Sequence, residues 1–88
     1  MQISPHIRAQ SAAIGAEVQE GRRKLGLRQD ELAVAAGVST RAIHQIEHGK
    51  PTSRLDTLSR VLEVLGLGLT VTERSPVHRE APEHRDEP

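Results

Sequence analysis

The sequence contains no phenylalanine, tyrosine or tryptophan, and no cysteine. Without cysteine, disulfide bonds and cysteine-ligated zinc are excluded. Without aromatic side chains, aliphatic residues and alanine must fill the core of any fold. No apolar run approaches the roughly 18 residues that a membrane-spanning helix needs, and residues 1–10 lack the apolar core of a signal peptide. We therefore expect a soluble, cytoplasmic protein.

The length of 88 residues suits a single domain. A domain of this size buries only about 60% of its unfolded surface, so we expect marginal stability and a benefit from oligomerisation.

The formal net charge is zero, but the charge is unevenly divided. Residues 22–54 hold seven Lys or Arg against three Asp or Glu, whereas residues 55–88 hold four against seven. Two interpretations remain open. Scattered surface charge can divide this way by chance, or the basic middle has an anionic partner such as nucleic acid.

Apolar residues at helical spacing predict a first helix from Ser11, its N-cap, to a stop at Gly26. Residues 1–10 then form a flexible arm. The second helix is expected over residues 29–36, with Gly37 as its stop and Leu27 as part of a hydrophobic staple.

Ser39 is expected to cap a third helix that ends at Gly49, and Leu55 to Leu65 mark a fourth that ends at Gly66. The sequence therefore predicts an all-α bundle of four to five helices over residues 11–66.

Residues 67–72, "LGLTVT", alternate Leu67, Leu69 and Val71 with glycine and threonine, which is the period of a strand. A lone strand leaves backbone groups unpaired and invites another chain. The segment is either a strand that pairs across a symmetric homodimer, or an extended tail whose leucines pack on the helices. Prolines among charged residues predict disorder over residues 73–88.

The second and third predicted helices are joined by a tight turn that contains Gly37, the arrangement of a helix-turn-helix motif. Four residues of the third helix share an outward sector of about 100°, with a fifth at its edge. All five can donate hydrogen bonds to base edges, and one is an arginine that can contact guanine bidentately. They are Thr40, Arg41, His44, His48 and, at the edge, Gln45. The third helix is thus predicted to be a DNA recognition helix.

Catalytic and metal sites are not indicated. His44 and His48 form an i, i+4 pair, but Gln45 stands where a zinc motif of the H-E-x-x-H type needs glutamate. No Ser-His-Asp arrangement or glycine-rich phosphate loop is visible. We expect no enzyme, no metal and no cofactor.

Residues 11–66 resemble the Cro/phage-repressor type of helix-turn-helix domain, the Xre family. The resemblance rests on "RRKLGLRQDELAVAAGVSTRAIHQIEHGKPTSRLDTLSRVLEVLG", in which L-G-L-x-Q-x-E-L-A, A-G-V-S and I-E-x-G-K occur at specific spacings. It implies that the outward residues of the third helix, Thr40, Arg41, His44 and Gln45, read base edges. It also implies a structural ion pair between Arg22 and Glu47.

The same resemblance implies contacts to DNA phosphates. Gln29 would clamp a phosphate beside the third helix and Lys50 would contact the backbone, with Ser39 and Arg54 as further phosphate contacts. Arg28 departs from the family pattern, because Thr or Ser usually caps this helix and arginine cannot accept the N–H bonds. Such a loss costs about 1 kcal/mol, and Arg28 is instead a hypothetical phosphate contact.

The fourth helix, "LGLGLTV" and the charged tail together resemble HipB-type antitoxins of type II toxin–antitoxin modules. That resemblance implies a homodimer that binds a palindromic operator in double-stranded DNA, represses its own operon and neutralises a HipA-type kinase toxin. The alternatives are a phage-type repressor, a restriction–modification controller protein, and a scaffold that does not bind DNA. Because no effector domain accompanies the helices, we expect a protein partner or proteolysis to control repression.

Overall fold

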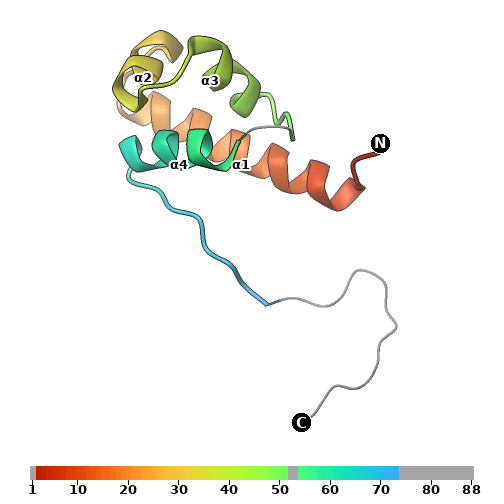
Figure 1. Ribbon diagram of the computed structural model, residues 1–88. Helices are drawn as coiled ribbons and strands as arrows, with labels where there is room; N and C mark the ends of the chain where they lie inside the picture. The colour runs from red at the N-terminus through yellow and green to blue at the C-terminus, as the bar shows by residue number, and fades with distance from the viewer. Residues whose placement is uncertain (1, 52–53, 74–88) are drawn as a thin grey trace, which may run out of the picture.

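The computed structural model describes residues 2–51 and 54–73, which form four helices. They are α1 (Pro5–Lys24), α2 (Gln29–Ala36), α3 (Thr40–Glu47) and α4 (Leu55–Val64). Helix α3 packs on both α1 and α2, and α4 contacts α2 and α3 (Figure 1). The predicted all-α architecture is confirmed over this part of the chain. The predicted disordered tail lies outside the described residues from residue 74 onward.

The core consists of aliphatic side chains and alanine, as the composition requires. Burying a side chain such as Leu or Ile contributes about 1.5–3 kcal/mol, so a few such residues dominate the stability of this small domain. The buried apolar residues are Val18, Leu32, Ala33, Ala36, Ile43, Ile46, Val61 and Leu62. They come from all four helices, so each helix depends on the others.

Helix α1 begins at Pro5, so the prediction of a start at Ser11 and of an arm through residue 10 is wrong. The Ser4 hydroxyl accepts the backbone N–H of Ile7 at 3.1 Å. Pro5 follows at the first helical position, where its missing N–H is not needed and its fixed φ suits the helix. The pair Ser4-Pro5 was the sequence signal for this start. In Figure 1 the N-terminal turns of α1 extend past the other helices.

The turn between α2 and α3 is fixed by Gly37, which adopts a left-handed φ of 72°. This conformation lets the N–H of Val38 donate to the carbonyl of Ala33 at 3.0 Å, closing the end of α2. Ser39 then caps α3, because its hydroxyl accepts the N–H of Ala42 at 3.0 Å. The predicted stop at Gly37 and cap at Ser39 are both confirmed.

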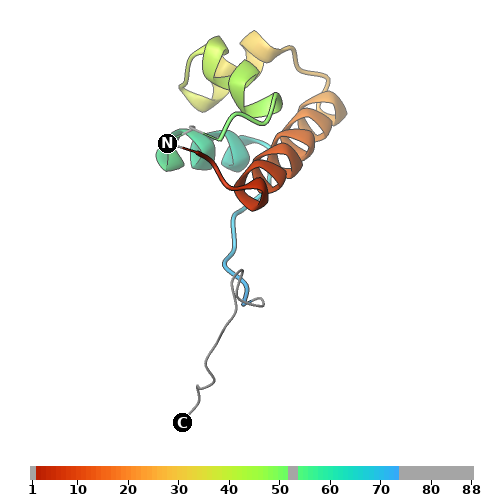
Figure 2. The same ribbon diagram turned by 90° about the vertical axis from the view of Figure 1, so that its right-hand side faces the viewer.

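Residues 67–73 leave the bundle in an extended path and form neither helix nor strand (Figures 1 and 2). The strand predicted over residues 67–72 is therefore absent from the single chain. A strand needs a neighbouring strand for its ladder, and the described residues offer none to this segment. Leu67 and Leu69 are partly exposed and Val71 is 99% exposed.

Helices α1 and α3 approach closely where α1 carries Gly15. A Cβ atom added at Gly15 would overlap the carbonyl oxygen of Ile46 and lie 3.0 Å from that of Glu47. Both are backbone atoms, so a side chain at Gly15 would push α3 away. A Cβ atom added at Gly21, on the same helix, would lie 3.5 Å from Leu65, an ordinary contact.

We expect Gly15→Ala and Gly21→Ala to change stability in opposite directions. Each gains about 1 kcal/mol of helix propensity, but Gly15→Ala also overpacks the α1–α3 contact, which typically costs about 1–3 kcal/mol. Urea unfolding followed by circular dichroism measures both. Equal stabilisation by the two substitutions would contradict the close approach of α1 and α3.

Candidate nucleic-acid interface

Helix α3 presents the outward face that the sequence predicts. Ile43 and Ile46 are buried against the core, which leaves Thr40, Arg41 and His44 exposed and Gln45 half-buried. The structure therefore brings all four predicted base-reading residues to one surface. Within the described residues, Arg41 makes no ion pair and no side-chain hydrogen bond, so its guanidinium is free to contact a ligand.

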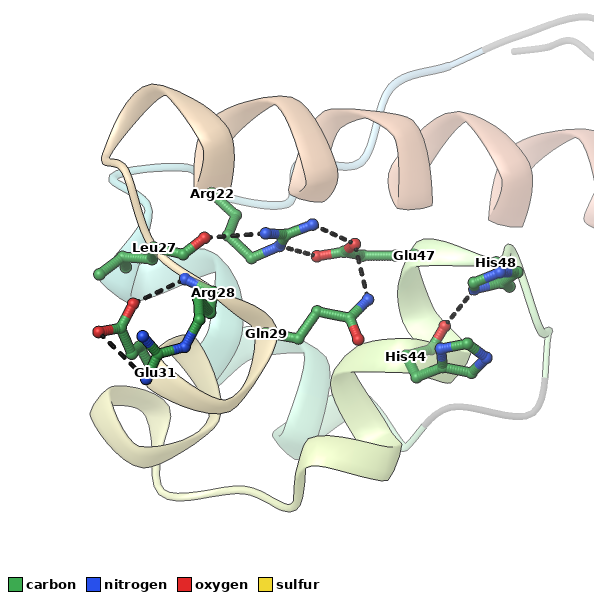
Figure 3. Close-up of polar contacts among 8 residues, drawn as sticks. All are labelled: Arg22, Leu27, Arg28, Gln29, Glu31, His44, Glu47 and His48. Atoms are coloured by element: carbon green, nitrogen blue, oxygen red, sulfur yellow. Dashed lines mark hydrogen bonds and ion pairs between the residues drawn. The ribbon is translucent and has the colours of Figure 1, made fainter.

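His44 and His48 lie together at the C-terminal end of this face. Their ring centroids are 4.0 Å apart with the planes tilted by 33°. Nδ1 of His48 lies 2.8 Å from the carbonyl oxygen of His44, and because a carbonyl only accepts, this nitrogen donates (Figure 3). His48 therefore packs against His44 and restricts how that ring can turn toward a ligand.

The carboxylate of Glu47 binds donors from two other helices. Arg22 of α1 donates through Nε to Oε2 at 2.6 Å and through Nη2 to Oε1 at 3.0 Å. Gln29, the first residue of α2, donates through Nε2 to Oε1 at 3.1 Å (Figure 3). The Glu47 side chain is fully buried and that of Arg22 is 12% exposed. The predicted Arg22–Glu47 pair is thus present, and it also holds Gln29.

Burial raises the pKa of Glu47, but hydrogen bonds from Arg22, Gln29 and Gln19 and the charge of Arg22 outweigh it, so the net pKa is lowered. The same hydrogen bond raises the pKa of Arg22. Both groups therefore stay charged at neutral pH. Removing one partner of such a pair typically costs about 3–5 kcal/mol. Sequence reasoning missed Gln19, which lies one turn before Arg22 on the same face of α1.

Gln29 lies where the family resemblance puts its phosphate-binding glutamine, at the start of α2 and bonded to α3. One N–H of its amide donates to Glu47. The amide has a second N–H, which can donate to a phosphate oxygen. The bond to Glu47 limits the directions in which that second donor can point.

Arg28 stands at the N-cap of α2 without a side-chain cap, as its chemistry dictates. Glu31 accepts the backbone N–H of Arg28 at 2.8 Å, which satisfies one group at this helix end. The Arg28 guanidinium donates to Asp30 at 3.1 Å. Arg54 stands at the N-cap of α4, and its Nε lies 3.2 Å from Oδ1 of Asp56. Both predicted phosphate contacts thus begin helices, and each is paired with an acid two residues later.

The remaining two predicted phosphate contacts flank α3. Ser39 uses its hydroxyl as the helix cap. Lys50 is exposed just after Gly49, and its backbone N–H donates to the carbonyl of Gln45 at 3.0 Å.

No helix in the described part of the chain is both long and apolar enough to cross a membrane. The described residues also contain no group of three or more His, Cys, Asp or Glu side chains suited to a metal ion.

A helix-turn-helix family model, HTH_3, matches residues 18–71, which include the whole motif and the segment after α4. The chain belongs to this family of DNA-binding transcription regulators. The predicted membership of the Xre type is confirmed.

The chain is similar to three further proteins. It is 45% identical over 60 residues to an uncharacterized HTH-type transcriptional regulator, y4mF, of Sinorhizobium fredii (strain NBRC 101917 / NGR234), a match that covers 68% of this chain and 79% of that protein. It is similar to the clp gene regulator ClgR from Corynebacterium glutamicum, with a TM-score of 0.58 and 29% identity over 66% of this chain and 62% of that chain. It is also similar to a toxin–antitoxin module from Streptococcus pneumoniae, with a TM-score of 0.63 and 36% identity over 80% of this chain and 74% of that chain.

Proposed function

We propose that this helix-turn-helix protein is a sequence-specific transcriptional repressor that inserts α3 into the major groove of operator DNA. The observation that supports this proposal is the exposed polar face of α3, on which Arg41 has no partner among the described residues. In this proposal Thr40, Arg41, His44 and Gln45 read base edges. The phosphate contacts come from Arg28, Gln29, Ser39, Lys50 and Arg54.

Arg41→Ala and Lys50→Ala should weaken binding in different ways. Loss of a base-reading arginine should cost about 1–3 kcal/mol on the selected site and relax base preference. Loss of a phosphate contact should weaken all sequences alike and reduce the salt slope by about 0.9. Fluorescence anisotropy with a duplex selected from a random library, and with its scrambled version, at several salt concentrations measures both effects.

Arg23→Ala serves as the matched control, because Arg23 is an exposed cation of α1 with no assigned contact. It should leave the ratio of selected to scrambled binding unchanged. If Arg41→Ala also leaves that ratio unchanged, its base-reading role is wrong. Failure of the wild type to select any sequence would overturn the proposed function.

We further propose that residues 67–72 pair with the same residues of a second copy, giving a homodimer that binds a palindrome. Leu67 and Leu69 line an apolar groove of about 320 Å³ whose other walls include Ile14 and Leu62. An antiparallel register centred on Leu69 pairs the three apolar residues only with one another, because Leu69 faces its own copy and Leu67 faces the partner's Val71. That valine, fully exposed in the single chain, would then lie over the groove.

The absence of cysteine from the chain makes this register testable by cross-linking. Facing residues in an antiparallel pair have Cβ atoms about 4.5–5.5 Å apart, close to disulfide geometry. Leu69→Cys should therefore form a covalent dimer on mild oxidation. Leu67→Cys and Val71→Cys should each fail alone but cross-link when the two variants are mixed. Covalent dimers of Leu67→Cys alone would refute this register.

A disulfide-independent measurement tests the dimer itself. Leu69→Pro disturbs the centre of the paired strands and should give a monomer in sedimentation, whereas Leu69→Val keeps a strand-forming side chain and should stay dimeric. Wild-type protein that sediments as a monomer at micromolar concentration would exclude the strand-paired dimer.

We also propose that the dimer is the antitoxin of a toxin–antitoxin module and neutralises a HipA-type kinase toxin. The similarity to the toxin–antitoxin module from Streptococcus pneumoniae, at 36% identity, supports a toxin partner. The kinase type of that toxin comes from the resemblance to HipB-type antitoxins. The second candidate is a phage-type repressor or restriction–modification controller protein without a toxin. The two regulator relatives are described only as regulators, so they favour this second candidate as much as they favour the first.

Co-expression with the product of the neighbouring gene distinguishes the two candidates. An antitoxin should restore growth inhibited by that product and co-purify with it. A parallel chain that ends at residue 73 locates the contact: rescue by both chains places the toxin on the described core. A neighbour that is harmless alone, or that never binds, would support the repressor without a toxin.

A further inference from the structure

Two helices of this chain begin with the same short pattern, arginine followed two residues later by aspartate. In α2 the pattern is Arg28-Gln29-Asp30, and in α4 it is Arg54-Leu55-Asp56. Both arginines occupy the N-cap in extended conformation, with φ and ψ of −80° and 165° for Arg28 and −73° and 146° for Arg54. Neither side chain accepts a hydrogen bond from its helix.

In each case the aspartate binds the guanidinium that precedes it. Nε of Arg28 lies 3.1 Å from Oδ1 of Asp30, and Nε of Arg54 lies 3.2 Å from Oδ1 of Asp56. Nη2 of Arg54 adds a bond of 3.2 Å to Oδ2 of the same aspartate. Glu31 makes an additional ion pair of 3.6 Å with Arg28. The acids also lie in the first helical turn, where negative charge is favourable.

These ion pairs are exposed to solvent and therefore weak. The side chains of Arg28 and Asp30 are 72% and 58% exposed, and those of Arg54 and Asp56 are 80% and 56% exposed. Pairs of this kind contribute about 0–1 kcal/mol. A guanidinium can instead form two parallel hydrogen bonds with a phosphate, which are stronger charge-assisted bonds. Each arginine can thus exchange its aspartate for a phosphate at little cost.

We propose that each arginine–aspartate pair is an exchangeable phosphate latch that sets the strength of DNA backbone binding. In the free protein the aspartate holds the guanidinium at the start of the helix. In the complex a backbone phosphate replaces the aspartate as the partner of Arg28 or Arg54. The aspartates thereby weaken backbone binding, because each competes for its arginine. This inference rests on the proposed DNA-binding function and adds Asp30 and Asp56 as residues that tune it.

The latches also determine which positive charges of residues 22–54 are paired with acids in the free protein. With Arg22 bound to Glu47 and the two N-cap arginines bound to aspartates, the positive charges of these three arginines are balanced locally by acids in the free protein. Arg41 retains its full charge. Contacts to the DNA phosphate backbone do not depend on the base sequence. Weakening these contacts therefore leaves a larger share of the binding energy to contacts with base edges.

A double-mutant cycle tests the latch of α2 with Asp30→Asn, Arg28→Gln and the combined variant. Binding to a scrambled duplex is measured by fluorescence anisotropy between about 50 and 200 mM salt. Asp30→Asn should strengthen binding about three- to fivefold, because Arg28 then binds its phosphate without first leaving Asp30. The salt slope should stay nearly unchanged, because the wild-type complex already makes the phosphate contact of Arg28. In the Arg28→Gln background the same substitution should change affinity less than about twofold, the residual effect of screened charge.

A second double-mutant cycle, with Asp56→Asn and Arg54→Gln, tests the latch of α4. If one set of variants misfolds, the other set can still be interpreted. Glu20→Gln controls for removal of any carboxylate, because Glu20 pairs with Lys24 on α1 and is 63% exposed. It should change the affinity for the scrambled duplex by less than about twofold. Circular dichroism checks that each variant is folded.

Three outcomes would overturn the latch. Equal effects of Asp30→Asn with and without Arg28 would mean simple charge removal. Weaker binding by Asp30→Asn would mean that the aspartate helps to place the arginine on DNA. Wild-type protein that binds no duplex would overturn the latch together with the proposed function. If the protein binds DNA but the effects of the aspartate and arginine substitutions simply add, only the latch is overturned.

Discussion

The position of α3 depends on the hydrogen bonds that the carboxylate of Glu47 accepts from two other helices. A helix of two turns is not stable by itself, so its place must be set by its surroundings. Glu47 receives Arg22 from α1 and Gln29 from α2, while Nη1 of Arg22 also donates to the carbonyl of Leu27 in the connection between those helices. Apolar packing could stabilise the bundle equally well, but it lacks the direction that these hydrogen bonds impose on α3.

This network requires α1 to lie close to α3, and the sequence of α1 supplies the space. Gly15, Gln19 and Arg22 are spaced by four and three residues, so they share one face of the helix. Gly15 allows the backbone of α3 to approach, and Gln19 and Arg22 then reach Glu47 one and two turns further along. By helix propensity alone Gly15 lowers the stability of α1, yet the contact that orients α3 needs a glycine at this position.

The features that the residues predicted correctly without the family resemblance are those determined by local chemistry, whereas the long-range Arg22–Glu47 pair was expected from the resemblance alone. Gly37 and Ser39 act within a few residues of their own positions, and the apolar spacing of α3 places Ile43 and Ile46 inside without knowledge of the other helices. The start of α1 was also local, but Ser4-Pro5 was missed because the apolar period was followed only from Ser11. The role of Gln19 and the absence of the predicted strand over residues 67–72 could not be obtained in this way. Gln19 binds a residue far along the chain, and a strand needs a second strand that one copy does not provide.

Formal charge also proved to be a poor guide to the surface that faces a ligand. The surplus of basic residues in the middle of the chain suggested an anionic partner, but three of those arginines are bound to acids in the folded chain. Arg22 is used inside the protein, and Arg28 and Arg54 carry aspartates at the starts of their helices. Arg41 differs from these in having no acid beside it while lying on the outward face of α3. Arg41 thus presents a positive charge without a neighbouring acid on the face of α3 that would read base edges in the proposed complex.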